Sequence, residues 1–278
     1  MVGRNSKLNF LYFAKCPQVE CNECPYKGRA IVYGPFTSRR RGLSIGVNLY
    51  PTAKVCSFNC VYCFRGATEL KTVEFTDLGV PTPAMLKKSL SEAISQIGDF
   101  ESIDFSGNGE PTLHPKLSEF VKTVKEFAAN NYGEVSVGLF TNSSMLLNDR
   151  VLTAISSLDH VEAKIDAVNE LKFNAVNMPE ESLTPRKILD GLKNLRKLFD
   201  GEIAIQVMLL RLGSLTNAEE SDAEALAEAL KSVEPNHVHL YTVYRKPRLS
   251  IVKPVSQEEI ERFASILTRE GFKAEIYT

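Results

Sequence analysis

The sequence predicts an α/β fold, a partial (β/α)6 barrel of the TIM type with a cysteine-containing extension at its N-terminus. After residue 43, short runs rich in β-branched residues alternate six times with amphipathic segments of helix length. Six strand–helix units in series favour a parallel sheet with right-handed crossovers, and six rather than eight leave a barrel open on one side. The candidate strands also alternate apolar with polar residues, which favours a barrel with a polar interior.

Local patterns predict the individual elements. Strands are expected at 44–50, 102–106, 135–141, 160–166, 203–210 and 237–242. Helices are expected at 83–97, 115–130, 149–157, 185–199, 218–232 and 257–270. Pro83 and Pro185 each follow a threonine at the start of a predicted helix, a position where the missing proline N–H costs no hydrogen bond.

The predicted strand at 160–166 shows the alternation clearly. Its apolar face carries Val161, Ala163 and Ile165, and its polar face carries Glu162, Lys164 and Asp166. This polar face does not suit a doubly wound sheet covered on both sides, so we expect a wet lumen that holds a ligand. In the alternative arrangement, helices cover only one face and the polar positions face solvent.

The chain is expected to have three parts: a basic N-terminal arm (1–43), the barrel (44–242), and a C-terminal helix and short strand that cap the barrel (243–278). The N-terminus lacks the apolar core of a signal peptide. No stretch reaches the roughly 18 apolar residues that span a membrane. We therefore expect a cytoplasmic, monomeric protein without a membrane partner.

All six cysteines lie within the first 63 of the 278 residues. Cys56, Cys60 and Cys63 follow the first predicted strand, at the end of an α/β barrel where active sites assemble. Three thiolates on one short loop can hold three irons of a [4Fe–4S] cluster and leave the fourth iron open to a chelating molecule. A zinc site would need a fourth ligand, and the four histidines are remote in sequence.

The spacing of these cysteines, with Tyr62 directly before the last one, resembles the cluster motif of the radical S-adenosylmethionine (SAM) superfamily. The segment 106–112 is similar to the Gly-Gly-Glu motif of that superfamily. It contributes four candidate cofactor-binding residues, Gly107, Asn108, Gly109 and Glu110. Together the two motifs imply a partial (β/α)6 barrel with radical SAM chemistry.

Further segments narrow the resemblance. Several segments resemble the archaeal wyosine-base-forming (4-demethylwyosine synthase-like) tRNA enzymes and their shorter relatives. These segments are residues 34–40, 44–49, 141–144, 165–167 and 241–242, together with Arg245 and Pro247. This resemblance implies a tRNA base as substrate. A small molecule, a peptide or a protein is the alternative substrate, and a non-catalytic zinc-binding adaptor is the rival from another functional class.

The resemblance also implies roles for individual residues. Cys56, Cys60 and Cys63 would ligate the [4Fe–4S] cluster, and the methionyl group of SAM would chelate the open iron. Glu110, together with Gly109, would hold the SAM ammonium group. Asn142 and Asp166 are candidates for the methionine and the ribose, and Tyr62 would lie near the adenine. An electron from a donor such as flavodoxin or ferredoxin would then release a 5′-deoxyadenosyl radical.

A second cysteine set, Cys16, Cys21 and Cys24, again lacks a local histidine. We expect it to bind an auxiliary [4Fe–4S] cluster, because wyosine-forming enzymes are similar in having three N-terminal cysteines for a second cluster. The spacing in those enzymes is much wider, a departure that counts against the wyosine reaction but not against a second cluster. A structural zinc ion and free thiols are the alternatives.

Charge is unevenly distributed along the chain. Residues 1–65 contain ten basic and two acidic residues, a net charge of +8, and the remainder contains 23 basic and 32 acidic residues, a net charge of −9. A basic arm can attract the phosphates of RNA. It could equally offset the charge of anionic iron–sulfur clusters or form a solvated surface.

Lys164 is a candidate catalytic residue on the polar face of its strand. A desolvated lysine can form a Schiff base with a carbonyl substrate. We favour an ion pair instead, because Glu162 and Asp166 flank it on the same face. On the last predicted strand, His239 and Tyr241 also alternate inward, where either could contact substrate.

Overall fold

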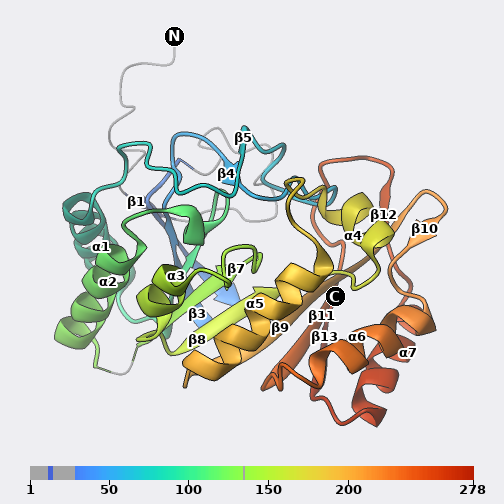
Figure 1. The fold of residues 1–278 in the computed structure, drawn as a ribbon. Coiled ribbons are helices and arrows are strands. Elements are labelled where there is room, and N and C mark those ends of the chain that lie inside the picture. Colours follow the sequence, from blue (N-terminus) through green and yellow to red (C-terminus); the bar gives the residue numbers. More distant parts are fainter. Residues whose placement is uncertain (1–11, 15–28, 134) are drawn as a thin grey trace.

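A computed structural model describes residues 12–14, 29–133 and 135–278. Its main sheet runs in the order β1-β2-β3-β6-β7-β8-β9-β11-β13, with β10 and β12 paired to β9 (Figure 1). The bounds of the path are β1 Tyr12–Ala14, β2 Val32–Ser38, β3 Gly42–Asn48, β6 Ser102–Ser106, β7 Ser136–Thr141, β8 His160–Lys164, β9 Glu202–Leu212, β11 His237–Thr242 and β13 Ala274–Tyr277. The sheet and its helices form an α/β partial barrel, so the predicted fold class is confirmed.

The six predicted strands correspond to β3, β6, β7, β8, β9 and β11, which are parallel neighbours in chain order. The six predicted helices also form: α1 Pro83–Ile97, α2 Leu117–Asn131, α3 Asp149–Ile155, α5 Pro185–Leu198, α6 Glu220–Leu230 and α7 Gln257–Arg269. Thr82 and Thr184 accept hydrogen bonds from the third helical N–H of α1 and α5, directly before Pro83 and Pro185.

Several elements were not predicted. They are β2, which forms a hairpin with β3, helix α4 (Glu170–Asn177), and the short strands β1, β4 (Val55–Cys56), β5 (Leu70–Lys71), β10 (Leu215–Thr216) and β12 (Val252–Pro254). The pair β4–β5 forms a separate small sheet, above the main sheet in Figure 1. Most of these elements are too short to show a periodic pattern of apolar residues.

The apolar faces of the parallel strands form the core beneath the helices. Neighbouring strands place apolar residues side by side, as Ile45 beside Ile103 and Ile103 beside Val137. All three side chains are fully buried. A continuous apolar layer of this kind holds the strand register, because a slip by one residue would turn each strand's apolar side chains to the opposite face.

The opposite faces line a polar interior, as predicted, but side chains of the β2–β3 turn enter it. Arg40 forms an ion pair with Glu162 of β8, and Arg41 Nε lies 3.2 Å from Asp104 Oδ1 of β6. Ser44 Oγ donates to the other oxygen of Asp104 at 2.7 Å. Part of the expected wet lumen is therefore occupied by ion pairs that the chain supplies itself.

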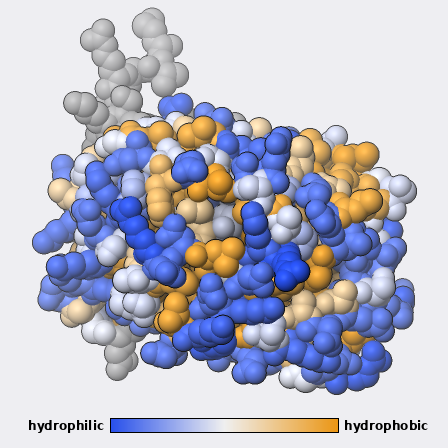
Figure 2. Space-filling model, in the orientation of Figure 1, coloured by the Kyte–Doolittle hydropathy of each residue, from blue (hydrophilic) through white to orange (hydrophobic). Residues whose placement is uncertain are grey.

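Hydrophobic and hydrophilic residues are interspersed on the face shown in Figure 2. Large hydrophobic side chains that are exposed include Leu70, Leu147, Leu171, Met178, Leu198, Tyr244 and Ile251. Among the helices of the described residues, none has both the length and the apolar character needed to cross a bilayer.

Candidate functional site

The loop that carries Cys56, Cys60 and Cys63 is attached to the end of β6. Val55 of β4 bridges to Gly109, and the Glu110 N–H donates to the Val55 carbonyl at 2.8 Å. Gly109 has a φ of 116°, and a Cβ at this position would lie 1.9 Å from that carbonyl oxygen. Glycine is therefore required here for the close approach to β4, and the predicted role of Gly109 in cofactor binding stays a prediction.

Helix α4 holds the other side of this loop. The Asn59 N–H donates to the Asn177 carbonyl and the Val61 N–H to the Val176 carbonyl, each at 3.0 Å. Phe58 packs edge-on against Phe173 of α4 and is 1% exposed. The loop is thus fixed between the ends of the parallel strands and helix α4 (Glu170–Asn177), which is distant in sequence.

Each of the three cysteine sulfurs faces a nitrogen donor on another side chain. Asn142 Nδ2 lies 3.4 Å from Cys56 Sγ, Asn177 Nδ2 lies 3.6 Å from Cys60 Sγ, and Lys54 Nζ lies 3.1 Å from Cys63 Sγ. The side chains of Lys54 and Asn177 are buried. Two neutral amides and one ammonium group are therefore placed to donate to the sulfurs, a hydrogen-bonding pattern suited to thiolates that carry negative charge.

All three cysteines are free, and the thiols of Cys56 and Cys60 resist ionisation on their own. Burial raises the pKa of Cys56, and the Glu110 carboxylate raises it further. Burial likewise raises the pKa of Cys60 to about 11. Such thiols stay protonated near neutral pH unless a metal displaces the proton, which is how a coordinated thiol becomes a thiolate.

Glu110 is buried behind the loop and joins the ends of two strands. Its carboxylate accepts from Thr112 Oγ1 at 2.6 Å, Thr141 Oγ1 at 2.7 Å and the Asn142 N–H at 2.6 Å. Burial raises its pKa, although these donors act in the opposite direction. Glu110 thus positions Asn142, whose amide contacts Cys56. Its predicted contact with the SAM ammonium group stays a prediction.

Gly107 and Asn108 contact the end of β3. Gly107 has a φ of 107°, and a Cβ there would lie 2.8 Å from the Cβ of Asn48. The Asn108 N–H donates to Asn48 Oδ1, and its side chain donates to the Tyr50 carbonyl. In this structure these two residues shape the turn, and their predicted role in cofactor binding stays a prediction.

Asp166 is a second buried carboxylate, directly beyond β8. Tyr62 Oη donates to Oδ2 at 2.5 Å and Asn177 Nδ2 at 2.6 Å, while Lys164 Nζ lies 3.0 Å from Oδ1. The expected ion pair of Lys164 therefore forms with Asp166. Glu162, the other acid expected beside Lys164, pairs instead with Arg40.

Two residues of this site were missed in the sequence. Lys54 lies two positions before Cys56, so its place beside the cysteine loop was available as a signal. Asn177 had none, because it lies at the end of the unpredicted helix α4, 117 residues beyond Cys60. The second cysteine set, Cys16, Cys21 and Cys24, lies outside the described residues.

Comparisons with known proteins agree with this site. Residues 50–214 match the radical SAM superfamily. The chain is 36% identical over 239 residues to a UPF0026 protein of Methanocaldococcus jannaschii, covering 85% of this chain and 70% of that protein. It is 28% identical over 225 residues to a UPF0026 protein of Helicobacter pylori, covering 79% of this chain and 70% of the relative.

Solved structures show the same fold at low sequence identity. A radical SAM methyltransferase from Sphaerobacter thermophilus superposes with a TM-score of 0.67 at 17% identity, covering 86% of this chain and 67% of that one. Streptococcus suis SuiB bound to S-adenosylmethionine gives a TM-score of 0.61 at 11% identity, covering 84% and 50%. The family match, the cysteine loop and the half-barrel agree, and the chain therefore belongs to the radical SAM superfamily, with UPF0026 proteins as its relatives.

Proposed function

We propose that this radical SAM enzyme cleaves SAM reductively and abstracts a hydrogen atom from its substrate. The supporting observation is the set of three cysteine sulfurs on one loop at the carboxyl end of the parallel strands, each facing a side-chain nitrogen donor. When bound, a [4Fe–4S] cluster and SAM supply the electron and the 5′-deoxyadenosyl radical of this chemistry. The chain itself supplies the cysteine ligands of the cluster and hydrogen-bond donors to their sulfurs, at the carboxyl end of the parallel strands.

The residues of the chain divide into two groups around this site. Cys56, Cys60 and Cys63 would ligate three irons, while Lys54 would offset part of the negative charge beside Cys63. Asn142 and Asp166 face the loop from the ends of β7 and β8, and both are buried and fixed by hydrogen bonds. We assign them to orientation of SAM, with Tyr62 and Lys164 holding the Asp166 carboxylate in place.

The test is formation of 5′-deoxyadenosine by the anaerobically reconstituted protein with SAM and dithionite. The wild-type chain should be brown and form the nucleoside, and the Cys56→Ser, Cys60→Ser, Cys63→Ser triple variant should not. Lys87→Met, an exposed change on α1, is the matched control. Reconstituted wild-type protein that retains about four irons but yields no 5′-deoxyadenosine would contradict the proposal.

A second cluster at Cys16, Cys21 and Cys24 is part of the proposal. Iron counting separates about eight irons per chain from about four. Serine at all three positions should lower the iron content by half and leave 5′-deoxyadenosine formation in place. An unchanged iron content would count against the second cluster. Flavodoxin or ferredoxin should replace dithionite as the electron donor.

A tRNA base is the candidate substrate, with wyosine-type modification as the reaction suggested by sequence resemblance. The charge argument for it is weaker in the folded chain, because Arg40, Arg41 and Lys54 of the basic segment point inward to Glu162, Asp104 and Cys63. Electrophoretic shift with bulk tRNA across a salt series tests this substrate class. No retardation at low salt would favour a small molecule, a peptide or a protein.

A further inference from the structure

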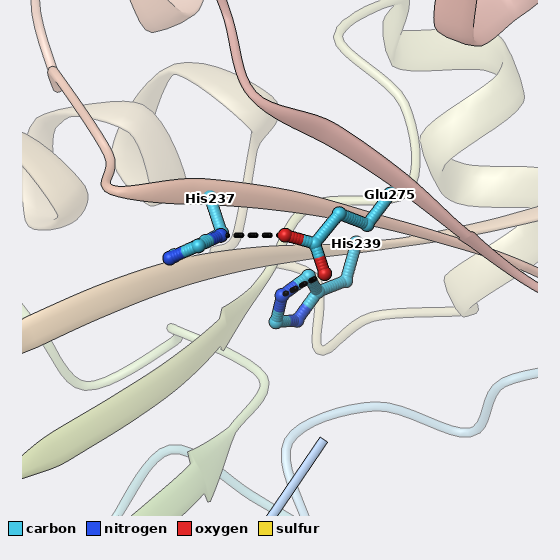
Figure 3. A group of neighbouring side chains, drawn as sticks. All are labelled: His237, His239 and Glu275. Atoms are coloured by element: carbon cyan, nitrogen blue, oxygen red, sulfur yellow. Dashed lines mark hydrogen bonds and ion pairs between the residues drawn. The ribbon is translucent and has the colours of Figure 1, made fainter. Parts of the chain in front are cut away.

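A cluster of histidines and glutamates lies toward the amino-terminal ends of the parallel strands, opposite the end that carries the cysteine loop. His237 and His239 are on β11, and Glu275 is on the neighbouring strand β13. His239 and Glu275 are partners in the register of these two strands. Figure 3 shows both imidazoles directed at the Glu275 carboxylate.

The ring nitrogens of His237 and His239 that face Glu275, together with the Glu275 carboxylate, are the kinds of atoms that bind metal ions. His237 Nδ1 lies 2.9 Å from Glu275 Oε1, and His239 Nε2 lies 4.0 Å from Glu275 Oε2. One ligand atom from each residue lies within 4.8 Å of the other two. Two imidazoles and one carboxylate form a recurrent ligand set for zinc, with water in the fourth position.

The outer nitrogen of each imidazole faces a second carboxylate. His239 Nδ1 lies 3.3 Å from Glu162 Oε1, and His237 Nε2 lies 3.7 Å from Glu202 Oε1. Histidines that bind a metal usually donate their other ring N–H to a carboxylate, which fixes the tautomer and directs the free nitrogen at the metal. His239 has this hydrogen bond with Glu162, whereas His237 Nε2 faces Glu202 just beyond hydrogen-bond distance.

His160 lies buried beside the two outer carboxylates of the cluster. Its side chain is 3% exposed, yet neither ring nitrogen makes a hydrogen bond. The two nitrogens lie 3.4 Å from Glu202 Oε1 and 3.5 Å from Glu162 Oε2, so His160 faces both outer carboxylates. Buried imidazoles without hydrogen bonds are costly, and bound groups or water commonly satisfy them.

Other charged and polar groups also approach the cluster. Lys273 Nζ lies 3.6 Å from Glu275 Oε1, but its side chain is 66% exposed and can turn into solvent. Tyr277 Oη donates to Glu275 Oε2 at 2.6 Å, and Arg40 pairs with Glu162. The Glu275 side chain is 35% exposed, so an ion can enter from solvent.

We propose that His237, His239 and Glu275 bind one divalent transition-metal ion of the zinc class, with Glu162 and Glu202 orienting the two imidazoles. The ion would replace the hydrogen bond between His237 and Glu275 and join β11 to β13. It would thereby fix the C-terminal strand to the barrel. This site is separate from the cysteine loop and independent of the proposed reaction.

Zinc and cobalt are the probes, applied to the reconstituted iron–sulfur protein. After desalting, the wild-type chain should retain one more Zn²⁺ than His237→Ala or Glu275→Gln, and Zn²⁺ should raise the melting temperature of the wild type but not of these two variants. In the difference spectrum with and without Co²⁺, which removes the absorption of the iron–sulfur cluster, bound Co²⁺ should add visible d–d bands and no thiolate-to-cobalt charge-transfer band. Glu202→Gln should weaken zinc binding about 10-fold through the orienting carboxylate. Glu224→Gln, exposed on α6, is the matched control.

Equal zinc content in the wild type and both ligand variants would overturn the proposal, as would a cobalt difference spectrum dominated by new thiolate-to-cobalt bands. Glu275→Gln has nearly the shape of the native side chain, so it keeps the test valid if His237→Ala fails to fold. Melting in chelator, without added metal, confirms that each variant is folded. Loss of zinc leaves 5′-deoxyadenosine formation measurable, so this result and that of the proposed function are separable.

Discussion

At the scale of single residues, Lys54 is the feature of the site with the clearest physical consequence. Its buried ammonium group donates to Cys63 Sγ at 3.1 Å and to the Gly66 carbonyl at 2.7 Å. A cluster becomes more negative when it gains an electron, so a nearby positive charge and an N–H···S bond stabilise the reduced form. Hydrogen bonds to cluster sulfurs and net charge are two of the factors that set iron–sulfur reduction potentials.

Lys54→Met should therefore lower the reduction potential of the cluster. A charge-assisted hydrogen bond contributes about 1.5–3 kcal/mol, and a tenfold change in a one-electron equilibrium corresponds to about 59 mV, so we expect a shift of about 60 mV or more. Redox titration followed by electron paramagnetic resonance measures it. Lys87→Met on α1 should not shift the potential. An unchanged potential in Lys54→Met, with full iron content, would show that Lys54 does not act on the cluster.

At the scale of elements, the close approach of β4 to the end of β6 decides where the cysteine loop begins. Gly109 sits at this contact with a positive φ and no room for a Cβ. Gly79 is the natural comparison, because its φ is also positive, at 77°, but no atom lies within 4 Å of a Cβ placed there. Replacing each glycine by alanine therefore separates two contributions to the loss of stability. One is the strained backbone conformation, which both variants share, and the other is the steric clash, which only the Gly109 variant has.

Gly109→Ala should lower the free energy of unfolding by about 3 kcal/mol or more and reduce iron incorporation, because Val55 and Cys56 must move away. Gly79→Ala should cost only about 1–2 kcal/mol, the penalty of a left-handed conformation, and leave iron content unchanged. Urea unfolding and iron analysis measure both effects. Equal losses in the two variants would show that the contact with Val55 is unimportant.

Most elements could be predicted because their signals are local. The strand β8 alternates apolar and polar residues, and α1 and α5 begin with a threonine cap and a proline. Helix α4 could not be predicted in this way, because its eight residues have only a weak apolar stripe. Helix α4 is nevertheless important for the site, because it supplies Asn177 beside Cys60 and holds the cysteine loop.

At the scale of the whole molecule, buried histidines make the fold sensitive to acid. His114 is 1% exposed, lies against the rings of Tyr50 and Phe120, and accepts from the Lys116 N–H. Burial lowers its pKa to about 4, against the opposing effect of Asp77. Because the unfolded chain has a histidine pKa near 6.5, unfolding takes up a proton between about pH 6.5 and pH 4.

The free energy of unfolding should therefore fall as the pH is lowered from 7 to 5, by about 1–2 kcal/mol from His114 alone. The His114→Gln variant lacks this proton uptake. Its free energy of unfolding should therefore fall less over the same pH range, whatever its value at pH 7. Urea midpoints at several pH values, with chelator present, measure the difference. Parallel curves for the two proteins would contradict the buried, neutral state of His114.

The sequence by itself determined the class of fold, the order of the parallel strands and the loop with the cluster cysteines. These features depend on the periodicity and spacing of residues along a continuous stretch of chain. Such patterns are set by interactions between residues that are near one another in sequence. The resemblance to radical SAM proteins rested on two such stretches, around Cys56 and around Glu110.

Only the tertiary structure decided what each polar side chain faces. Arg40 and Arg41 read as a basic arm in the sequence, but in the fold they pair with Glu162 and Asp104 inside the barrel. His237, His239 and Glu275 became a cluster only when β13 aligned beside β11. The physical reason is that such contacts depend on strand register and helix packing across many residues, which no local pattern of the sequence specifies.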